Sequence, residues 1–179
     1  VLARGDADIV SMARPMLADP ELVLKAAQGR EDEINTCIAC NQACLDHTFG
    51  GRKQVSCLVN PRACNETLLQ YLPAPVARKI AVIGAGPAGL SYATVAAQRG
   101  HRVSLFDAGA EIGGQFNLAK RVPGKEEFHE TLRYYRRMID VLGIDLHLNT
   151  RVDVALLAPM HFDEVVVATG ITPRRPEIP

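Results

Sequence analysis

The sequence predicts an α/β protein whose main domain is a parallel sheet with helices over its faces. Four short apolar runs typical of buried strands lie at residues 79–83, 102–107, 145–148 and 164–168. Apolar residues recur at helical spacing in residues 88–98 and 126–142, so strands and helices alternate along the chain. A glycine-rich turn joins the first strand to the first helix. This alternation is typical of parallel sheets, because each crossover helix packs back onto the sheet.

A shorter unit of the same kind precedes the sheet. Residues 8–13 form an apolar run that we interpret as a buried strand. A helix is expected to follow, with Asp19 as its N-cap and Pro20 in its first position. Gly29 is a natural C-cap for this helix. The first thirty residues therefore predict one strand–loop–helix unit.

The segment between the two α/β parts has no regular pattern. Residues 31–72 contain all five cysteines, so we expect this segment to fold around whatever the cysteines bind. Pro73 and Pro75 stiffen the chain and mark the best domain boundary.

Composition excludes several classes of function. The 179 residues carry 20 basic and 20 acidic side chains, so no overall field attracts nucleic acid or an anionic membrane. Arg133, Arg136 and Arg137 have helical spacing and are interpreted as a solvated helix face, with a phosphate-binding role as the alternative. No apolar run approaches the roughly eighteen residues of a membrane span. We expect neither a nucleic-acid partner nor a membrane partner.

The cysteine count and the chain ends suggest a setting. Five cysteines, an odd number without a signal-peptide layout before them, favour a reducing compartment, so a cytoplasmic location is expected. The chain opens with Val1 rather than Met and stops at Pro179, each beside a predicted strand. We therefore expect a fragment of a larger protein.

The glycine turn has the pattern of a dinucleotide site. Gly84 permits the tight turn, Gly86 lets backbone approach a pyrophosphate, and Gly89 lets helix and strand pack closely. Asp107 lies eighteen residues beyond Gly89, at the end of the next strand, where a carboxylate accepts hydrogen bonds from ribose hydroxyls. The alternative is a glycine-rich turn without a ligand.

Two later motifs favour FAD over a nicotinamide nucleotide. Gly113, Gly114 and Gln115 resemble the second glycine pair of flavoproteins with two dinucleotide domains. Thr169 and Gly170 end a strand in an Ala-Thr-Gly motif typical of the same proteins. Our full set of expected cofactor contacts is Ala13, Arg14, Gly84, Gly86, Ala88, Gly89, Asp107, Gly114, Gln115, Val152, Thr169 and Gly170.

Four cysteines have the spacing of a metal site. Two, three and twelve residues separate Cys37, Cys40, Cys44 and Cys57. Thiolates are soft ligands that suit either an iron–sulfur cluster or zinc, and spacing alone leaves both open. The neighbouring flavin motifs favour the cluster, because zinc has no redox role to share. Cys64 is interpreted as a buried, inert thiol, with a fifth ligand as the alternative.

Catalytic side chains are not evident. Arg14 follows the first predicted strand and is either a surface arginine or a phosphate contact at the mouth of a barrel. The histidines lie at turns or on predicted exposed faces, apart from His47 in the cysteine segment. We find no Ser/His/Asp arrangement and no catalytic pair of carboxylates.

Specific strings resemble a known family. The string CIACNQACLD from Cys37, SCLVNPRAC from Ser56 and GGQFNLAK from Gly113 resemble bacterial-type NADPH-dependent 2,4-dienoyl-CoA reductase, and so does PGKEEF from Pro123. The resemblance runs through essentially the whole chain. Trimethylamine dehydrogenase and enoate reductases share the same layout and remain alternatives, as does a non-catalytic, zinc-clipped nucleotide-binding module.

The resemblance implies three parts. Residues 1–30 would be the last strand and helix of an FMN-binding (β/α)8 barrel, with Ala13 and Arg14 at the FMN phosphate. Residues 31–75 would carry a 4Fe-4S cluster on the four cysteines. Residues 76–179 would form a Rossmann-like, incomplete FAD-binding domain that breaks off where the NADPH domain is inserted. Asp107 stands where many relatives have Glu, and either carboxylate can accept from ribose.

The resemblance also implies a relay of electrons. They would pass from NADPH to FAD, singly through the cluster to FMN, and then to an unsaturated acyl-CoA substrate. The family's catalytic tyrosine and histidine come from earlier barrel strands, so no residue of this chain is expected to be a catalytic acid. The chain alone is expected to be inactive.

Overall fold

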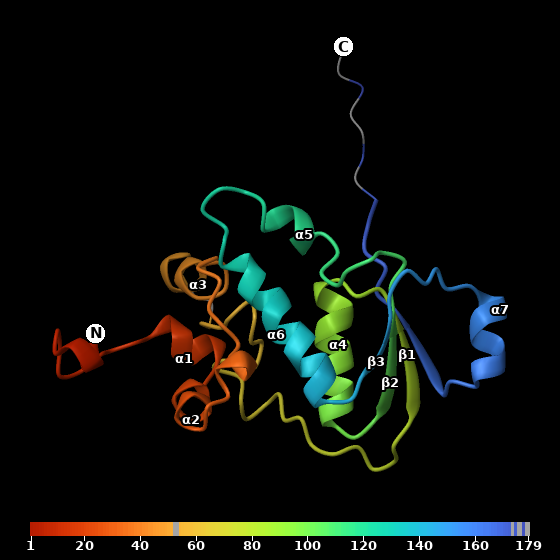
Figure 1. The fold of residues 1–179 in the computed structure, drawn as a ribbon, viewed down its shortest axis with the longest axis horizontal. Coiled ribbons are helices and arrows are strands. Elements are labelled where there is room, and N and C mark those ends of the chain that lie inside the picture. The colour runs from red at the N-terminus through yellow and green to blue at the C-terminus, as the bar shows by residue number, and fades with distance from the viewer. Residues whose placement is uncertain (52–53, 173, 175–176, 178–179) are drawn as a thin grey trace. The chain divides into compact units, whose positions relative to one another are not determined.

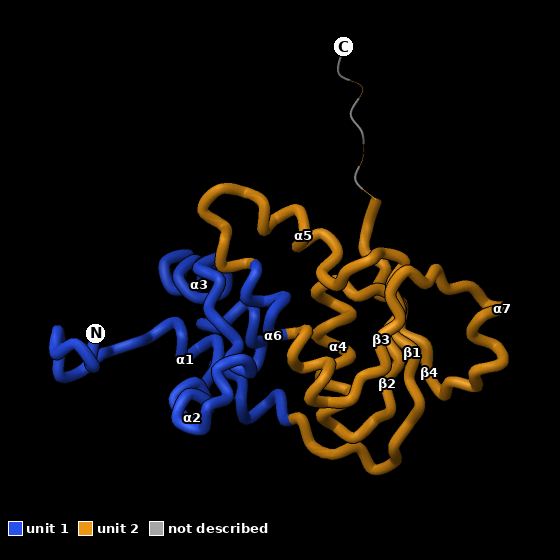
Figure 2. The backbone as a smooth tube through the Cα atoms, in the orientation of Figure 1, with its two compact units in different colours: residues 1–70, 129–134 blue, residues 71–128, 135–179 orange. Residues whose placement is uncertain are grey.

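A computed structural model of the chain describes residues 1–51, 54–172, 174 and 177. The chain divides into two compact units (Figure 2). The first contains Val1–Gln70 and His129–Tyr134, and the second contains Tyr71–Phe128 and Tyr135–Pro179. Each unit is described separately below. None of the helices in the described part of the chain combines the length and hydrophobicity needed to cross a bilayer.

The second unit is built on a four-stranded parallel sheet. Its strands are β1 (Lys79–Ile83), β2 (Arg102–Phe106), β3 (Asp145–His147) and β4 (Glu164–Val167). Their order across the sheet is β3-β2-β1-β4, and every neighbouring pair is parallel. All four strands lie where the apolar runs predict them, so the predicted α/β fold with a parallel sheet is confirmed.

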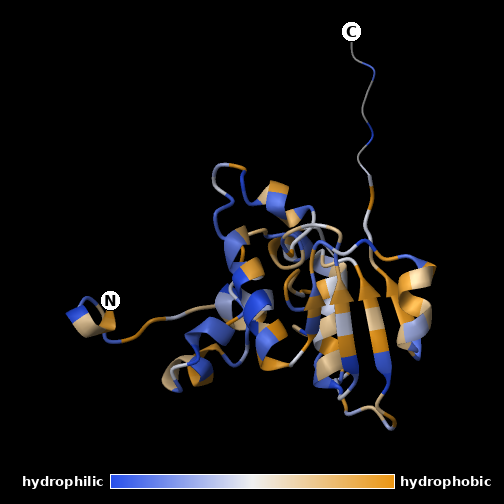
Figure 3. Cartoon of the chain, turned by 45° about the vertical axis from the view of Figure 1, so that its right-hand side comes forward, coloured by the Kyte–Doolittle hydropathy of each residue, from blue (hydrophilic) through white to orange (hydrophobic). Residues whose placement is uncertain are grey.

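One face of the sheet carries the core of this unit. Helix α4 (Pro87–Gln98) follows β1, and its Leu90 and Ala93 pack against Ile80 and Val82. The alternation of β-strand side chains puts Ile80 and Val82 on the same face. Figure 3 shows the strands as predominantly hydrophobic in colour. Helix α6 (Phe128–Val141) adds Ile139 to the same cluster.

The opposite face of the sheet is less covered. Figure 1 shows α4 and α7 (Val154–Leu157) on opposite sides of the sheet. Among the strands of the described chain β4 pairs only with β1, and it exposes Val165 and Val167 on the side away from α4. Helix α5 (Phe116–Ala119) and a 3-10 turn, η3 (Ala158–Met160), complete the unit.

Short helices and loops form the first unit. Its elements are η1 (Leu2–Arg4), α1 (Arg14–Ala18), α2 (Leu22–Ala27), η2 (Glu31–Glu33) and α3 (Leu45–Phe49). Gly29 follows α2 with a left-handed φ of +68°, as expected of a residue that ends a helix.

The strand predicted at residues 8–13 is wrong. This segment has no strand pairing, and Ile9 is 85% exposed. A strand needs a neighbour to satisfy its backbone N–H and C=O groups, and the strands of the described chain all belong to the second unit. Apolar residues alone therefore did not make a strand here.

The start of the next helix also differs from expectation. Helix α2 begins at Leu22, so Asp19 is not its N-cap and Pro20 precedes the helix. The Asp19 carboxylate accepts a hydrogen bond from the Glu21 backbone N–H at 3.0 Å, but its other contacts lead away from the helix end. Those contacts matter for the cysteine segment below.

Candidate functional site

The turn between β1 and α4 can contain only glycine at two positions. Gly84 has a φ of +108°, and a Cβ there would lie 2.3 Å from the carbonyl oxygen of Ala168. A Cβ at Gly89 would lie 1.8 Å from the carbonyl oxygen of Gly84. Both glycines therefore permit close packing of strand, turn and helix. This is the role that such glycines have in the dinucleotide-binding motif.

Gly86 is different, because it borders open space. A Cβ at Gly86 would have no atom within 4 Å, and its φ of −76° suits any residue. Gly86 is the N-cap residue of α4, with Pro87 in the first turn. The N–H groups that begin a helix of this length favour an anion placed beside them. A glycine that packing does not require, at such a position, leaves room for a ligand.

The second glycine pair lies directly against the first. Gly113 donates its backbone N–H to the Ala85 carbonyl at 2.7 Å. A Cβ on Gly114 would approach the Gly86 Cα to 3.1 Å, and Gly114 has a left-handed φ of +52°. Two motifs far apart in sequence therefore form one continuous glycine-lined surface.

Asp107 ties the glycine turn to the end of β2. Its Oδ2 accepts a hydrogen bond from the Ala85 N–H at 2.6 Å, and its Oδ1 accepts one from the Gly109 N–H at 2.7 Å. Each carboxylate oxygen has a further lone pair. The side chain is thus fixed in orientation and still able to accept hydrogen bonds from a ligand.

A pocket of about 360 Å³ opens at the carboxyl end of these strands. This volume is within the range of small-molecule sites. Its lining residues are Ile83, Gly84, Phe106, Asp107, Ala108, Thr150, Arg151, Val152 and Thr169. Ligands of open α/β sheets bind at this end of the strands.

The pocket gathers four of the expected cofactor residues: Gly84, Asp107, Val152 and Thr169. Gly86, Gly89 and Gly114 lie at the adjoining turn, and Gly170 follows Thr169 in the chain.

Two other residues of the expected FAD set, Ala88 and Gln115, do not line this pocket. Ala88 lines a different pocket on α4, together with Tyr92 and Arg99. The Gln115 amide donates to the Ile171 carbonyl at 3.4 Å.

Sequence reasoning missed Thr150 and Arg151. Both line the pocket, and the Thr150 N–H donates to the Asp107 carbonyl at 2.8 Å. The available signal was their position just after β3, because a residue that follows a parallel strand lies at the same edge as Asp107.

In the first unit, the four cysteines at ligand spacing surround one small pocket. Its lining residues are Arg14, Leu17, Cys37, Ile38, Cys40, Asn41, Ala43, Cys44, Cys57, Leu58 and Val59. Cys64 is not among them and is exposed, so the interpretation of Cys64 as a buried thiol is wrong. Cys64 has a φ of +62° in a surface turn. The apolar character of a thiol favours burial and gives no sign of such a turn.

Local backbone geometry brings the first three cysteines together. Ala39 and Asn41 both have left-handed φ angles, of 52° and 59°, so the chain turns sharply on either side of Cys40. Cys57 comes from a later loop, where an antiparallel bridge pairs it with Asn60. The Ser56 N–H donates to the Ala43 carbonyl at 2.8 Å and joins the two segments.

The environment of Cys57 favours its thiol over its thiolate. Burial raises the pKa of Cys57 above its ordinary value of 9.0, although the N–H groups of Val59 and Asn60 act in the opposite direction. The nearby Cys37 and Cys40 raise this pKa further. A positive metal centre would reverse this balance, because metal ligation deprotonates a thiol outright.

The cysteine pocket is narrow. Its free volume is about 10 Å³, close to that of one water-sized sphere. No group of three His, Cys, Asp or Glu side chains in the described chain has the geometry to hold a metal ion. The four cysteines thus line one pocket without having the geometry of a metal site. Their side chains would have to turn to admit a metal centre. Donor chemistry fits such a centre, because four thiolates are a complete ligand set.

Arg14 lines the cysteine pocket. Its Nη1 donates to Asn41 Oδ1 at 2.8 Å. Ala13, its expected companion at an FMN phosphate, is exposed and precedes α1. The described structure thus puts Arg14 beside the cysteine loop.

Residues 78–179 match the pyridine nucleotide-disulphide oxidoreductase family. The chain belongs to this family. The match begins just before β1, so it covers the strands, the glycine turn and Asp107. The cysteine segment lies outside it.

Longer relatives align with both parts of the chain. A metal reductase from Desulforamulus reducens is 42% identical over 183 residues, which are 100% of this chain and 27% of the relative. An NADH oxidase from Thermoanaerobacter brockii is 35% identical over 179 residues, which are 99% of this chain and 28% of the relative.

A solved structure shows the same similarity in three dimensions. The 2-naphthoyl-CoA reductase complex with 2-naphthoyl-CoA superposes with a TM-score of 0.94 at 42% identity, over 99% of this chain and 27% of that one. The chain thus spans about a quarter of the length of these oxidoreductases.

Proposed function

We propose that this chain is the FAD-binding and cluster-binding part of an oxidoreductase that reduces a carbon–carbon double bond in an acyl-CoA thioester. The specific type we propose is NADPH-dependent 2,4-dienoyl-CoA reductase, working in the cytoplasm. The observation that carries the proposal is the 360 Å³ pocket, where Gly84, Asp107, Val152 and Thr169 meet beside the two glycine motifs. Membership of the pyridine nucleotide-disulphide oxidoreductase family supports it.

Each residue at the pocket has a distinct part in holding FAD. The backbone at Gly86 and Gly114 would lie against the pyrophosphate, because neither residue has a side chain to exclude it. The N-terminus of α4 would stabilise the phosphate charge. Asp107, held by two backbone N–H groups, would accept hydrogen bonds from the ribose. Val152 and Thr169 would line the nucleoside end.

Cys37, Cys40, Cys44 and Cys57 would hold a 4Fe-4S cluster. Such a cluster supplies one-electron transfer, which suits a chain that also binds a flavin, because a flavin can exchange electrons singly or in pairs. The cysteines contribute four thiolates from one pocket, and Arg14 contributes a positive charge on its rim. FMN, on a barrel ending near Ala13 and Arg14, and NADPH complete the proposed set of cofactors.

The choice of substrate rests on one relative. The solved structure reported for comparison is a 2-naphthoyl-CoA reductase in complex with 2-naphthoyl-CoA, whereas the two sequence relatives are named a metal reductase and an NADH oxidase. A CoA thioester is therefore the substrate class that structural similarity favours. This chain supplies no residue that we assign as the catalytic acid.

Cofactor analysis of anaerobically purified protein tests the proposal. We expect bound FAD, together with about four irons and four sulfides per chain. One zinc without sulfide would turn the cysteine segment into a structural clip and would contradict the relay. Absence of FAD after reconstitution would contradict the assignment of the glycine pocket.

A further inference from the structure

We propose that Asn35, held by Asp19, is a positioning residue that keeps the two cysteine-bearing segments around one pocket. The inference rests on the proposed metal-binding function of the four cysteines and names residues outside the ligand set. Neither Asp19 nor Asn35 lines the cysteine pocket.

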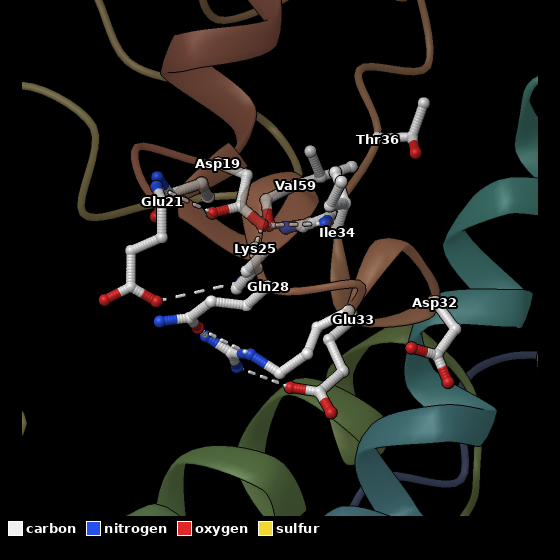
Figure 4. Close-up of polar contacts among 12 residues, drawn as sticks. Asp19, Glu21, Lys25, Gln28, Asp32, Glu33, Ile34, Thr36 and Val59 are labelled. Carbon is white, nitrogen blue, oxygen red and sulfur yellow. Dashed lines mark hydrogen bonds and ion pairs between the residues drawn. The ribbon is translucent and has the colours of Figure 1, made fainter. Parts of the chain in front are cut away.

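A buried carboxylate is the anchor of this arrangement. Asp19 is only 3% exposed, and its Oδ2 accepts hydrogen bonds from Lys25 Nζ at 2.7 Å and from the Asn35 N–H at 2.9 Å. Its Oδ1 accepts one from the Glu21 N–H. Figure 4 shows Lys25 and Glu21 beside Asp19. Lys25 balances the buried charge, and three donors satisfy the carboxylate, which is the condition for keeping an ion pair out of water.

Asn35 connects Asp19 to the second cysteine segment through hydrogen bonds. Its Nδ2 donates to the Val59 carbonyl at 2.8 Å. Asn35 precedes Cys37 by two residues, and Val59 follows Cys57 by two. One side chain therefore joins the backbone before the first ligand to the backbone after the last one.

The orientation of the Asn35 amide is determined by this contact. Its Oδ1 is buried and accepts no hydrogen bond from the described residues. Turning the amide over would place that oxygen against the Val59 carbonyl and would lose the donor. An unpaired buried oxygen costs free energy, so the donor function explains why an amide occupies this position.

A second amide supports the same loop. Asn60 Nδ2 donates to the Leu17 carbonyl at 2.9 Å, and Leu17 lines the cysteine pocket. The Cys57 loop is thus held from both sides by asparagine side chains. Asn35 is the one whose own backbone is fixed by a buried charge.

Asn35→Leu is the direct test, because leucine has a similar size and cannot donate. The backbone N–H to Asp19 remains, so the anchor is retained. Asn65→Leu is the matched control, since the Asn65 amide donates to the carbonyls of Pro61 and Ala63 in its own turn. Asn35→Ala is a smaller second variant that also lacks the donor, for use if leucine prevents folding.

Zn²⁺ binding to the full chain, freed of metal under reducing conditions, is the primary measurement. We expect Asn35→Leu and Asn35→Ala to weaken Zn²⁺ binding about fivefold, the factor that corresponds to one buried hydrogen bond. Asn65→Leu should bind as the unsubstituted chain does. Circular dichroism at the same temperature checks that each variant is folded. Equal affinity in all four proteins would overturn the inference, because a purely structural contact would lower the unfolding temperature alone.

Iron retention separates this inference from the proposed function. Anaerobic protein with its iron is exposed to a chelator, and we expect iron to leave Asn35→Leu about fivefold faster than Asn65→Leu. If the unsubstituted protein contains no iron and sulfide but Asn35→Leu weakens Zn²⁺ binding, the cluster proposal fails and the positioning role stands. If the unsubstituted protein has its cluster and both Asn35 variants match the control, the positioning role fails alone.

Discussion

The two candidate sites are built in opposite ways. The nucleotide pocket lies at the end of a parallel sheet, where the carbonyls of Ala168 and Gly84 come so close to Gly84 and Gly89, respectively, that neither position can hold a larger residue. The cysteine pocket lies among loops and short helices, where polar side chains such as Asn35 and Asn60 hold the backbone. The first site is shaped by close packing of backbone and the second by individual hydrogen bonds. A substitution should therefore affect folding at Gly84 and Gly89 of the first site and ligand retention at the second.

The largest effect should follow loss of a cysteine ligand. Cys40→Ala is expected to abolish visible cluster absorbance and most of the bound iron, because three thiolates leave one corner of the centre open. FAD content should remain. Cys64→Ala is the control, since Cys64 is exposed and outside the pocket. Unchanged iron content in Cys40→Ala would contradict the cluster assignment.

Close packing at the glycine turn gives the next largest effect. In Gly89→Ala the new Cβ would lie 1.8 Å from the Gly84 carbonyl oxygen, so backbone must shift. We expect a loss of unfolding free energy of about 1–3 kcal/mol, as for other overpacked sites. Urea denaturation measures it. Gly86→Ala, which meets no atom within 4 Å, should stay within about 1 kcal/mol of the unsubstituted chain; equal losses in the two variants would show that packing does not distinguish these glycines.

Gly86→Ser separates ligand binding from folding at the same turn. Serine is a favourable N-cap residue, and the φ of −76° suits it, so stability should be maintained. Its side chain would occupy the space that we assign to the pyrophosphate, and FAD affinity should fall about tenfold or more. Fluorescence titration with FAD measures the change. An affinity equal to that of the unsubstituted chain would place the pyrophosphate elsewhere.

The smallest effect should be a pH dependence within the second unit. Burial raises the pKa of Tyr135 above its ordinary value of 10.0, although a hydrogen bond with Ser91 lowers it in part. The folded chain therefore holds this proton more tightly than the unfolded chain does. Its contribution to stability is present below pH 10.0 and is lost as the pH rises through the higher pKa of the folded state.

Tyr135→Phe should flatten that alkaline loss. Urea midpoints at neutral pH and above pH 10.0 would measure it, with Tyr92→Phe on the exposed side of α4 as the control. A slope that is the same in Tyr135→Phe and in the unsubstituted chain would assign the alkaline loss to other groups.

The sheet could be predicted from sequence because local and tertiary preferences agree there. The run at residues 79–83 is apolar, is followed by a glycine turn and is buried on both sides. The sequence pattern and the position in the sheet therefore both favour a strand. The glycine and Asp107 positions follow from the fingerprint because a short turn leaves little freedom. Thr150 and Arg151 were missed because the position of these loop residues depends on where the preceding strand, β3, lies in the sheet.

The cysteine segment was predictable in its ligand spacing and in little else. Spacing identifies four cysteines, but the segments that carry them are joined by hydrogen bonds of Asn35 to Asp19 and to Val59, across sixteen and twenty-four residues of sequence. Asp19 has the pattern of a helix cap, and that local interpretation fails because a partly buried lysine and a distant N–H both donate to its Oδ2. The strand predicted at residues 8–13 fails because no neighbouring strand is available in its unit.

Strand β4 has a practical consequence for handling the chain. Its outer edge pairs with no strand of the described chain, and Val167 on its outer face is 71% exposed. Such an edge offers unpaired backbone groups to any extended segment that approaches it, including the same strand of another molecule. We expect the isolated chain to self-associate with rising concentration, and Val167→Lys to suppress this association. Light scattering over a dilution series would measure it, and equal scattering from both proteins would show that solubility is limited elsewhere.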